Sequence, residues 1–306
     1  MGIKCCSGDP RKEPEICKEA IVEIDEEAES SPVPRGESFR SLASMSTQTS
    51  CSSPTPPMEA RVKRVSFDLG NGSTYQGEWL NGMRDGKGKH KDKEGLHYTG
   101  EWLADIRHGF GKQEFDNGDV YFGQWRDDLQ EGNGTLQREG YKYVGQWSLG
   151  LKHGIGKEYW VGDSNDTPKL EYEGEFKFGH RSGFGTMKYA DGSVYVGNWS
   201  QGKRCGVGAL TLDVGEYTGT WFDDTMHGYG KLLQNDGTSY IGEVKYGTMD
   251  GKGKLTQKDG SYFDGYWRQG VISGTGTRYY ARKDRTRRES WYKGKFIKVM
   301  KDVKFK

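Results

Sequence analysis

The sequence predicts an all-β protein, a long array of β-hairpins that follows a disordered N-terminal segment. Three observations predict this class. A pattern of about 23 residues recurs from Tyr75 to the C-terminus, turn-forming Gly and Asp residues stand at fixed places within it, and the first 60 residues share neither feature. Internal repetition at this period indicates a repeat architecture, in which each unit packs against its neighbours. Both fold and function must therefore be inferred from the array.

Each repeat begins with an aromatic residue, which is followed two residues later by Gly and four residues later, in most repeats, by Trp. The first aromatics are Tyr75, Tyr98, Tyr121, Tyr143, Tyr172, Tyr195, Tyr217, Tyr240, Phe263 and Tyr292. The steps between them are 22 or 23 residues, with two steps of 29. In this column, called the Trp column, only Val244 is not aromatic, and nine repeats carry a Gly-x-Gly that begins seven residues past it. Tyr292, Gly294 and Phe296 are expected to begin a tenth, half repeat.

The spacing within a repeat predicts a hairpin. Tyr75, Gly77 and Trp79 lie on one face of an extended strand, because side chains alternate with a period of two. Gly or Asp, three residues past the Trp column, favours a tight turn, and the Gly-x-Gly is expected to open the return strand. Asn-Gly and Asp-Gly pairs such as Asn117-Gly118 predict the next turn. No helix of normal length fits between these turns.

The string YQGEWLNGMRDGKGK, residues 75–89, resembles the MORN repeat family. The resemblance covers residues 71–296 as nine repeats and a half, and it implies an elongated, single-layer antiparallel sheet of stacked hairpins. At about 4.8 Å per strand and two strands per repeat, nine repeats extend over roughly 85 Å. A long rigid surface suits binding and scaffolding. Candidate partner contacts are the aromatic and glycine face and the two longer connections, residues 161–170 and 278–290.

The first 60 residues are expected to be a disordered tether. They contain 6 Lys and Arg against 11 Asp and Glu, with an acidic run over residues 13–29 and a Ser, Thr and Pro-rich stretch over residues 41–57. Such a composition has too few apolar side chains to bury. Its hydroxyl-rich stretch is also an expected target of phosphorylation.

The N-terminus carries an acylation motif. Gly2 is exposed once Met1 is removed, which suits N-myristoylation, although Cys6 stands where the motif usually has Ser or Thr. Cys5 and Cys6 are predicted palmitoylation sites, and a second acyl chain makes a membrane anchor stable. The alternative is an unmodified N-terminus with two free thiols. Without a secretory signal or a bilayer-spanning stretch, the protein is expected to face the cytosol.

The C-terminal end is basic: residues 278–306 contain 12 Lys and Arg against 3 Asp and Glu. Cations among aromatic residues suit anionic lipid headgroups or an acidic partner. The alternative is a charged cap on an exposed edge strand. Nucleic acid is not an expected partner, because no recognised nucleic-acid module accompanies the charge. The candidate residues are Arg282, Lys283, Arg285, Arg287, Arg288, Lys293, Lys295 and Lys298, ahead of a basic tail at residues 297–306.

Residues 61–70 resemble a docking motif for the type-1 serine/threonine protein phosphatase. In that motif an extended peptide adds to a sheet edge of the phosphatase and inserts two apolar side chains, here Val65 and Phe67, after the basic Arg64. The alternative is that these residues form the strand that leads into the first repeat. Ser66 and Ser290 follow basic residues and are candidate phosphorylation sites, and phosphate on Ser66 would weaken docking.

The sequence indicates no catalytic site, no metal site and no cofactor. His108, His153, His227 and Cys205 all stand just before the first Gly of the Gly-x-Gly, so they belong to the repeat. The expected function is a non-enzymatic scaffold that tethers cytoskeletal or signalling proteins to the cytoplasmic face of a plasma or ciliary membrane. Two alternatives remain: a cytoskeletal or axonemal component like those of radial spokes, and a targeting subunit for the phosphatase or a phosphoinositide kinase.

Overall fold

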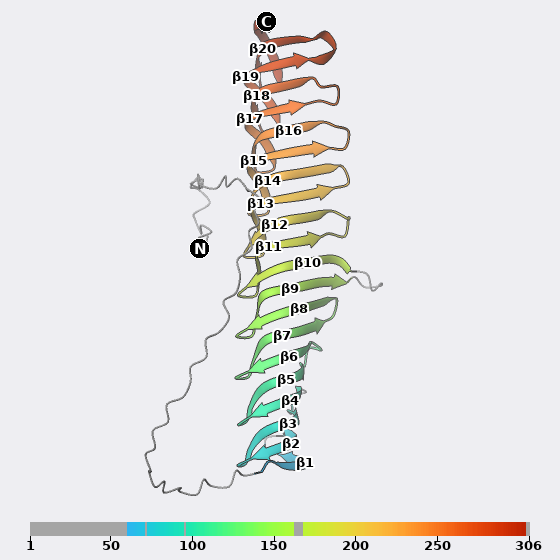
Figure 1. Ribbon diagram of the computed structural model, residues 1–306, viewed down its shortest axis with the longest axis vertical. Coiled ribbons are helices and arrows are strands. Elements are labelled where there is room, and N and C mark those ends of the chain that lie inside the picture. The colour runs from blue at the N-terminus through green and yellow to red at the C-terminus, as the bar shows by residue number, and fades with distance from the viewer. Residues whose placement is uncertain (1–59, 71, 95, 162–167, 304–306) are drawn as a thin grey trace, which may run out of the picture. The chain divides into compact units, whose positions relative to one another are not determined.

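The structure, a computed structural model, describes residues 60–70, 72–94, 96–161 and 168–303. Residues 60–303 contribute one antiparallel sheet of 21 strands. Each strand pairs with the strands before and after it in the chain, as Figure 1 shows. The predicted all-β fold and its single antiparallel layer are confirmed. The elements are β1 Val62–Asp68, β2 Thr74–Leu80, β3 Met83–Lys91, β4 His97–Leu103, β5 Ile106–Glu114, β6 Val120–Arg126, β7 Leu129–Arg138, β8 Tyr141–Ser148, β9 Leu151–Val161, β10 Pro168–Lys177, β11 His180–Lys188, β12 Val194–Ser200, β13 Lys203–Leu212, β14 Gly215–Phe222, β15 Thr225–Gln234, β16 Ser239–Lys245, β17 Thr248–Thr256, β18 Tyr262–Arg268, β19 Val271–Tyr280, η1 Ala281–Lys283, β20 Arg285–Tyr292 and β21 Lys295–Val303.

Two-residue turns close the hairpins within the repeats. In the first, Asn81 and Gly82 have φ of 53° and 80°, and the equivalent residues of the other repeats also have positive φ. Positive φ at both central residues defines the type I′ turn, whose twist matches that of the flanking strands. The Gly or Asp three residues past the Trp column therefore forms the turn, as predicted.

The Gly-x-Gly lies inside the return strand and does not open it. β3 begins at Met83, directly after the turn, and Gly88 pairs with Gly77, after which the register shifts. Gly86 sits in this bulge with a φ of +98°. The Glu78 carboxylate accepts a hydrogen bond from the Lys87 N–H at 2.9 Å. The first glycine of the pair thus supplies the backbone conformation of a β-bulge.

The core is a ladder of aromatic rings that runs along the array. The Tyr75 ring lies over Gly77 and Gly88, and its hydroxyl donates to the Glu78 carbonyl at 3.1 Å. Its centroid is 5.1 Å from that of Trp79 and 5.6 Å from that of Trp102 in the next repeat, both edge to face. The buried rings of the ladder are Tyr75, Trp79, Tyr98, Trp102, Tyr121, Trp125, Tyr143, Trp147, Tyr172, Phe176, Tyr195, Trp199, Tyr217, Trp221, Tyr240, Phe263 and Trp267.

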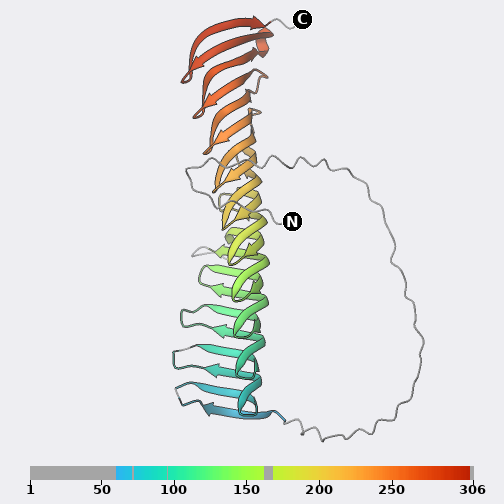
Figure 2. The same ribbon diagram turned by 90° about the vertical axis from the view of Figure 1, so that its left-hand side faces the viewer.

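A flat single sheet would leave these rings exposed to solvent. In this array, by contrast, the strands are bent. Figure 2 shows the strands curving across the array while the sheet twists along its length. The sheet is therefore a trough. We call the face that carries the aromatic ladder the trough face, and the opposite one the outer face.

The register of the last repeat differs from the prediction. Trp291 pairs with Gly274, so Trp291 occupies the Trp column, while Lys293 and Gly294 form the turn. Tyr292, Gly294 and Phe296 therefore do not begin a half repeat. Glu289 stands opposite Gly276, where other repeats have a second glycine, and its side chain is buried. The backbone pairing of β19 with β20 sets the register, and the Tyr-x-Gly-x-Phe spacing is accidental.

This register changes two further boundaries. The tyrosine-column position of the last repeat is Arg287, 24 residues after Phe263, so the only 29-residue step is the one from Tyr143 to Tyr172. The connection after β19 is η1, not a long loop. Residues 297–303, expected as a basic tail, continue the sheet as β21 because their backbone pairs with β20.

Candidate functional site

The trough face changes character along the array. The change is seen first in the column of residues that pair with the Trp column. Five of the first six repeats carry a cation at this position. Arg84 lies 4.1 Å above the Trp102 ring and Arg204 lies 4.4 Å above Trp221, typical of cation–π contacts. The next three repeats have half-buried apolar side chains instead. The column reads Arg84, Arg107, Gln130, Lys152, Arg181, Arg204, Met226, Met249 and Ile272.

The column of residues that pair with the first aromatics also changes from polar to apolar along the array. It is mostly polar up to the fourth repeat, and from the fifth to the eighth repeat it is apolar. The column reads His90, Gln113, Leu136, Glu158, Met187, Leu210, Leu232, Leu255 and Arg278. Together the two columns give the trough a polar, cationic N-terminal half and a C-terminal half that becomes apolar in steps. The second column is apolar from β11 onward, whereas Arg181 and Arg204 still lie on β11 and β13, so both columns are apolar only on β15 and β17.

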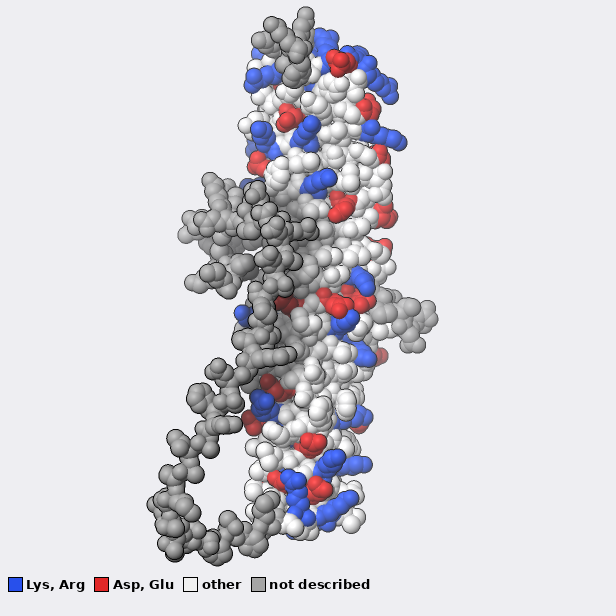
Figure 3. Space-filling view, in the orientation of Figure 1, with Lys and Arg blue, Asp and Glu red and all other residues white. Residues whose placement is uncertain are grey.

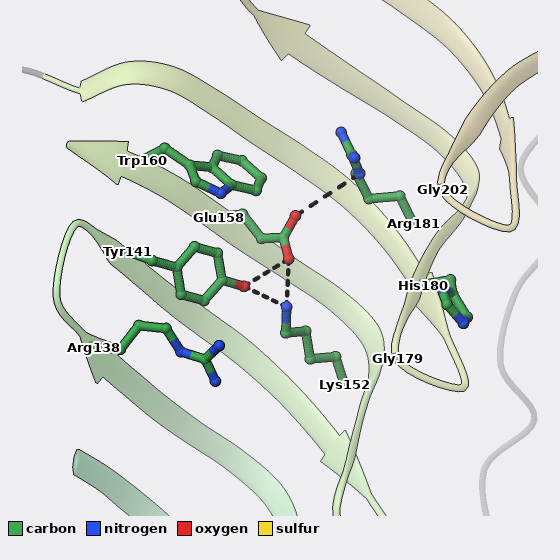
Figure 4. A pocket seen from close by; sticks show the side chains of 9 residues that line it. All are labelled: Arg138, Tyr141, Lys152, Glu158, Trp160, Gly179, His180, Arg181 and Gly202. Atoms are coloured by element: carbon green, nitrogen blue, oxygen red, sulfur yellow. Dashed lines mark hydrogen bonds and ion pairs between the residues drawn. The ribbon is translucent and has the colours of Figure 1, made fainter. Parts of the chain in front are cut away.

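A depression of about 410 Å³ lies on the trough face where these halves meet. We call it the basin. Figure 4 shows Tyr141, Lys152, Glu158 and Arg181 pointing toward one another, with Trp160 beside them. The residues that line it are Arg138, Tyr141, Lys152, Glu158, Trp160, Gly179, His180, Arg181 and Gly202.

Glu158 organises the basin. Its side chain is only 6% exposed, and its carboxylate accepts hydrogen bonds from Lys152 Nζ at 2.5 Å and from the Tyr141 hydroxyl at 2.7 Å. Arg181 Nε lies 3.9 Å from its other oxygen. Burial, with the hydrogen bond to Glu158, raises the pKa of Tyr141, so this phenol stays a donor.

The basin carries an excess of positive charge. Lys152 and Arg181 share one carboxylate, and Arg138 adds a third cation 5.4 Å from the Tyr141 ring centroid. Asp119 lies 3.3 Å from Arg138 and offsets part of this charge. With Trp160 and Tyr141 as aromatic walls, the arrangement suits an anionic group attached to an apolar chain.

The phosphatase-docking candidates lie on β1, the first strand of the sheet. Val65 is 83% exposed beside an irregularity in the pairing with β2, between Arg64 and Phe67. The Phe67 ring packs edge to face on Trp79 at 5.3 Å, and the Arg64 guanidinium lies 5.1 Å above the same indole. Ser66 is exposed. The motif is thus both a structural strand and an accessible edge.

The basic candidates lie on η1, β20, β21 and the turn that joins these strands. The side chain of Arg282 on η1 is 88% exposed, and Arg287 is partly buried in the tyrosine column. Lys283, Arg285, Arg288, Lys293, Lys295 and Lys298 are exposed. Ser290 is half-buried in β20 and pairs with Lys298. Figure 3 shows Lys and Arg side chains over the C-terminal strands, and others over the first strands.

The acylation candidates Gly2, Cys5 and Cys6 lie outside the described residues. Among those that the structure describes, no helix is long and apolar enough to cross a membrane. No group of three His, Cys, Asp or Glu side chains in the same residues could hold a metal ion. The histidines before the Gly-x-Gly do not converge: His153 contacts Phe178, and His227 contacts Phe222 and Tyr246.

Nine segments between residues 75 and 285 match the MORN repeat, one for each hairpin from β2–β3 to β18–β19. The chain belongs to the MORN repeat family. MORN repeats are generally non-catalytic, and their presence indicates a repeat protein that binds membranes or proteins. The matched segments are residues 75–96, 98–120, 121–139, 143–164, 172–194, 195–215, 217–239, 240–262 and 263–285.

Curated relatives share only part of this MORN array. Alsin from Rattus norvegicus is 31% identical over 83 residues, which cover 24% of this chain and 5% of Alsin, and Alsin from Homo sapiens matches equally. The chain therefore spans a small part of these relatives. Among solved structures, the SAS-4 (dCPAP) TCP domain in complex with a proline-rich motif of Ana2 (dSTIL) of Drosophila melanogaster covers 67% of this chain and 99% of its own, at 11% identity. The TM-score of this match is 0.33.

Sequence reasoning missed the basin. Its residues come from four strands, β7, β8, β9 and β11, and from two turns, and only the turn glycines Gly179 and Gly202 belong to a known motif. The available indication was the departure of the fourth repeat from its own columns, with Glu158 where most other repeats have an apolar or neutral residue. Bent strands are needed to bring such residues together, and the spacing alone does not predict the bend.

Proposed function

We propose that this MORN protein is a non-enzymatic scaffold that holds partner proteins at the cytoplasmic face of a membrane, the plasma membrane or a ciliary membrane. The observation that carries the proposal is the trough, a long face with a cationic half, an apolar half and a basin between them. Such a face suits a partner segment laid along the repeats. The acylation motif at the N-terminus, Gly2, Cys5 and Cys6, supplies the membrane signal.

The membrane arm is tested by localisation of a fusion with a C-terminal fluorescent protein. Wild type is compared with Gly2→Ala and with Cys5→Ser/Cys6→Ser, together with metabolic labelling by myristate and palmitate analogues. We expect label on the wild type and loss of membrane localisation in both variants. Label-free protein that sits on filaments or axonemes in all three forms would replace this proposal by the cytoskeletal alternative.

The basic C-terminal strands are proposed to strengthen the anchor by contact with anionic lipid. Each exposed cation near such a surface contributes about 1 kcal/mol. Sedimentation with vesicles of neutral lipid, with and without phosphatidylserine or a phosphoinositide, should show binding that needs the anionic lipid, falls with salt and weakens in Arg282→Glu/Lys283→Glu. Equal binding by the variant would leave these cations as a cap on the edge of the sheet.

A second candidate function is targeting of a type-1 protein phosphatase. The observation that favours it is the exposure of Val65 on a first strand that can add to another sheet. Val65→Ala should abolish co-purification of the phosphatase without lowering the stability of the array, because the Val65 side chain is 83% exposed. A phosphatase retained by Val65→Ala would exclude docking through this motif. Capture of a phosphoinositide kinase in the same experiment would support the other targeting role.

A further inference from the structure

We propose that the basin binds an Asp or Glu side chain of a partner segment, and that Arg181 is the residue that holds its carboxylate. This inference rests on the trough being the face that binds partners, as proposed above, and it names the chemistry of the partner. The joints between successive repeats supply the evidence. At a joint, the turn of one repeat lies against the strand that pairs with the Trp column of the repeat before.

The joints share one backbone geometry. The N–H of the second turn residue donates to the carbonyl of the residue that pairs with the preceding Trp column, which we call the column residue. This bond joins Asp105 to Arg84 at 2.9 Å and Gly202 to Arg181 at 2.9 Å, and it recurs at the other joints. The second turn residue is therefore placed alike whether it is Asp or Gly.

Three joints have Asp at this place, and each Asp pairs with an arginine. Asp105 Oδ1 accepts hydrogen bonds from the Arg84 Nε and from the Arg84 backbone N–H, both at 2.9 Å. The turn Asp thus neutralises the cation of the preceding repeat and also caps its N–H. Equivalent bonds of 2.7 to 3.2 Å hold the pairs Arg107–Asp128 and Arg204–Asp224.

The joints with Gly at this place mostly have an uncharged column residue. These residues are Gln130, Met226, Met249 and Ile272. In the described chain, Lys152 and Arg181 are the exceptions, and both line the basin together with their turn glycines, Gly179 and Gly202. The basin therefore forms where two successive cations lack the carboxylate that a turn supplies elsewhere.

Within the basin, Arg181 is the cation without a close partner. Lys152 binds Glu158 at 2.5 Å, and Arg138 lies 3.3 Å from Asp119. Among the described residues, the carboxylate nearest to Arg181 is that of Glu158, 3.9 Å from Nε, which is too far for a hydrogen bond. The Arg181 side chain is only 25% exposed. A cation at this depth is stabilised when a carboxylate binds it.

The place for that carboxylate is open. A Cβ on Gly202 would meet no atom of the described residues within 4 Å, so the space that an Asp side chain occupies at other joints is free. Figure 4 shows Gly202 on the turn next to Arg181. The basin, about 410 Å³, is larger than a carboxylate, and Trp160 and Tyr141 line it. It therefore suits an acidic side chain with the apolar atoms of its own chain, and its recessed shape fits a peptide better than a flat bilayer.

Peptide binding tests the inference. The probe is a fluorescein-labelled heptapeptide that alternates Leu and Glu, and its binding to the full chain, purified without acylation, is followed by fluorescence anisotropy. The same peptide with Gln in place of Glu is the control ligand. We expect the Glu peptide to bind saturably, at least tenfold more tightly than the Gln peptide, with an affinity that falls as salt is added.

Gly202→Asp restores a turn carboxylate beside Arg181 and should weaken binding of the Glu peptide at least tenfold. The turn tolerates the change, because Asp105 has a φ of 68° where Gly202 has 81°. The urea midpoint should be no lower than that of the wild type. Gly270→Asp is the matched control, since Gly270 has a φ of +79°, equally open space and the uncharged column residue Met249. Its affinity should stay within twofold of the wild type.

Arg181→Gln removes the cation itself and should also weaken binding at least tenfold. The array tolerates Gln in this column, because Gln130 already stands there beside a turn glycine. The β-sheet circular dichroism of this variant should match that of the wild type.

Three results would each overturn the inference: no saturable binding by the wild type up to about 1 mM peptide, equal affinity for the Gln peptide, or full affinity in Gly202→Asp. A lower urea midpoint in Gly202→Asp would also overturn it, because the new carboxylate would then not pair with Arg181. Phosphatidylserine vesicles that bind the wild type but not Gly202→Asp would assign the basin to a lipid headgroup and overturn the peptide assignment. The scaffold proposal is judged by membrane localisation, so a peptide that fails to bind a protein that still localises would remove only this inference.

Discussion

At the scale of single residues, paired glycines make the aromatic ladder possible. A Cβ on Gly145 would lie 2.5 Å from the Gly156 Cα and 2.6 Å from the Tyr143 hydroxyl. The same crowding recurs at the equivalent pairs from Gly77 to Gly276. Glycine is required here for closeness of approach, whereas at the turns it is favoured for its backbone conformation.

Gly145→Ala should therefore lower the free energy of unfolding by about 3 kcal/mol, the upper part of the range for overpacking a core. Gly202→Asn is the control, since Gly202 has a φ of +81° and open space around it, and Asn tolerates that conformation. It should cost less than about 1 kcal/mol. Urea denaturation followed by tryptophan fluorescence measures both, and equal losses would contradict this distinction.

We expect His90 to make the stability of the first repeats depend on pH. Burial lowers the pKa of His90, and the charges of Arg84 and Arg107 lower it further. The unfolded chain therefore takes up a proton more readily than the folded one, so stability should fall as the pH drops from 7 toward 5. His90→Gln, which introduces the residue that the next repeat has at Gln113, should reduce this fall. Parallel pH profiles of the urea midpoint for both proteins would refute the assignment.

At the scale of elements, several turns carry residues that suit them poorly. Leu149, Phe178 and Tyr246 occupy the first turn position with φ of 51°, 50° and 48°. Left-handed backbone costs such residues roughly 1–2 kcal/mol, whereas Asn is tolerated there. These residues are 62–73% exposed, so burial does not explain them, although Phe178 and Tyr246 contact His153 and His227. Exposed apolar side chains at strained positions are consistent with partner contacts along this edge.

Leu149→Asn should raise the free energy of unfolding by about 1 kcal/mol. The first repeat provides the precedent, because Asn81 occupies the same position with a φ of 53°. The urea midpoint of the variant is the measurement, and Asn81→Leu is the reciprocal change that should destabilise by a similar amount. A variant that is more stable but captures fewer partners would identify Leu149 as a binding residue.

The elements also show how much the sequence could predict. Trp, Gly and Asp spacings were sufficient for the hairpins and their turns, because each of these residues acts within one or two strands. The last repeat was predicted in the wrong register, since Tyr292, Gly294 and Phe296 imitate the pattern while Trp291 and Glu289 hold the true columns. The basin could not be predicted, because it depends on the bend of the strands. The acylation and docking motifs stay predictions.

At this end of the sheet the buried Glu289 stands where the other repeats have a glycine. Its carboxylate accepts hydrogen bonds from Arg278 Nε at 3.1 Å, the Tyr280 hydroxyl at 2.8 Å and Trp291 Nε1 at 3.1 Å. Arg278 and Tyr280 tie β19 to β20 where the ladder ends, and Trp291 holds the carboxylate from its own strand. A buried carboxylate with such partners is costly to disturb, which suits a terminal cap.

At the scale of the whole array, each repeat contacts mainly its two neighbours. Removal of residues 285–306 should therefore weaken β18 and β19, which lose Trp291 and Glu289 as partners, and leave the hairpins near β2 unchanged. Hydrogen exchange measured by mass spectrometry would show faster exchange confined to the last hairpins. Faster exchange along the entire array would mean that the array unfolds as one cooperative unit.

The direction of the strands sets how the array responds to force. Because every strand lies across the long axis, a pull on the two ends loads the backbone hydrogen bonds one row at a time, and the strands peel apart sequentially. Each released repeat of about 23 residues frees roughly 75 Å of chain. A scaffold fixed at a membrane by one end and to a moving partner by the other would therefore lengthen in regular steps before it detached.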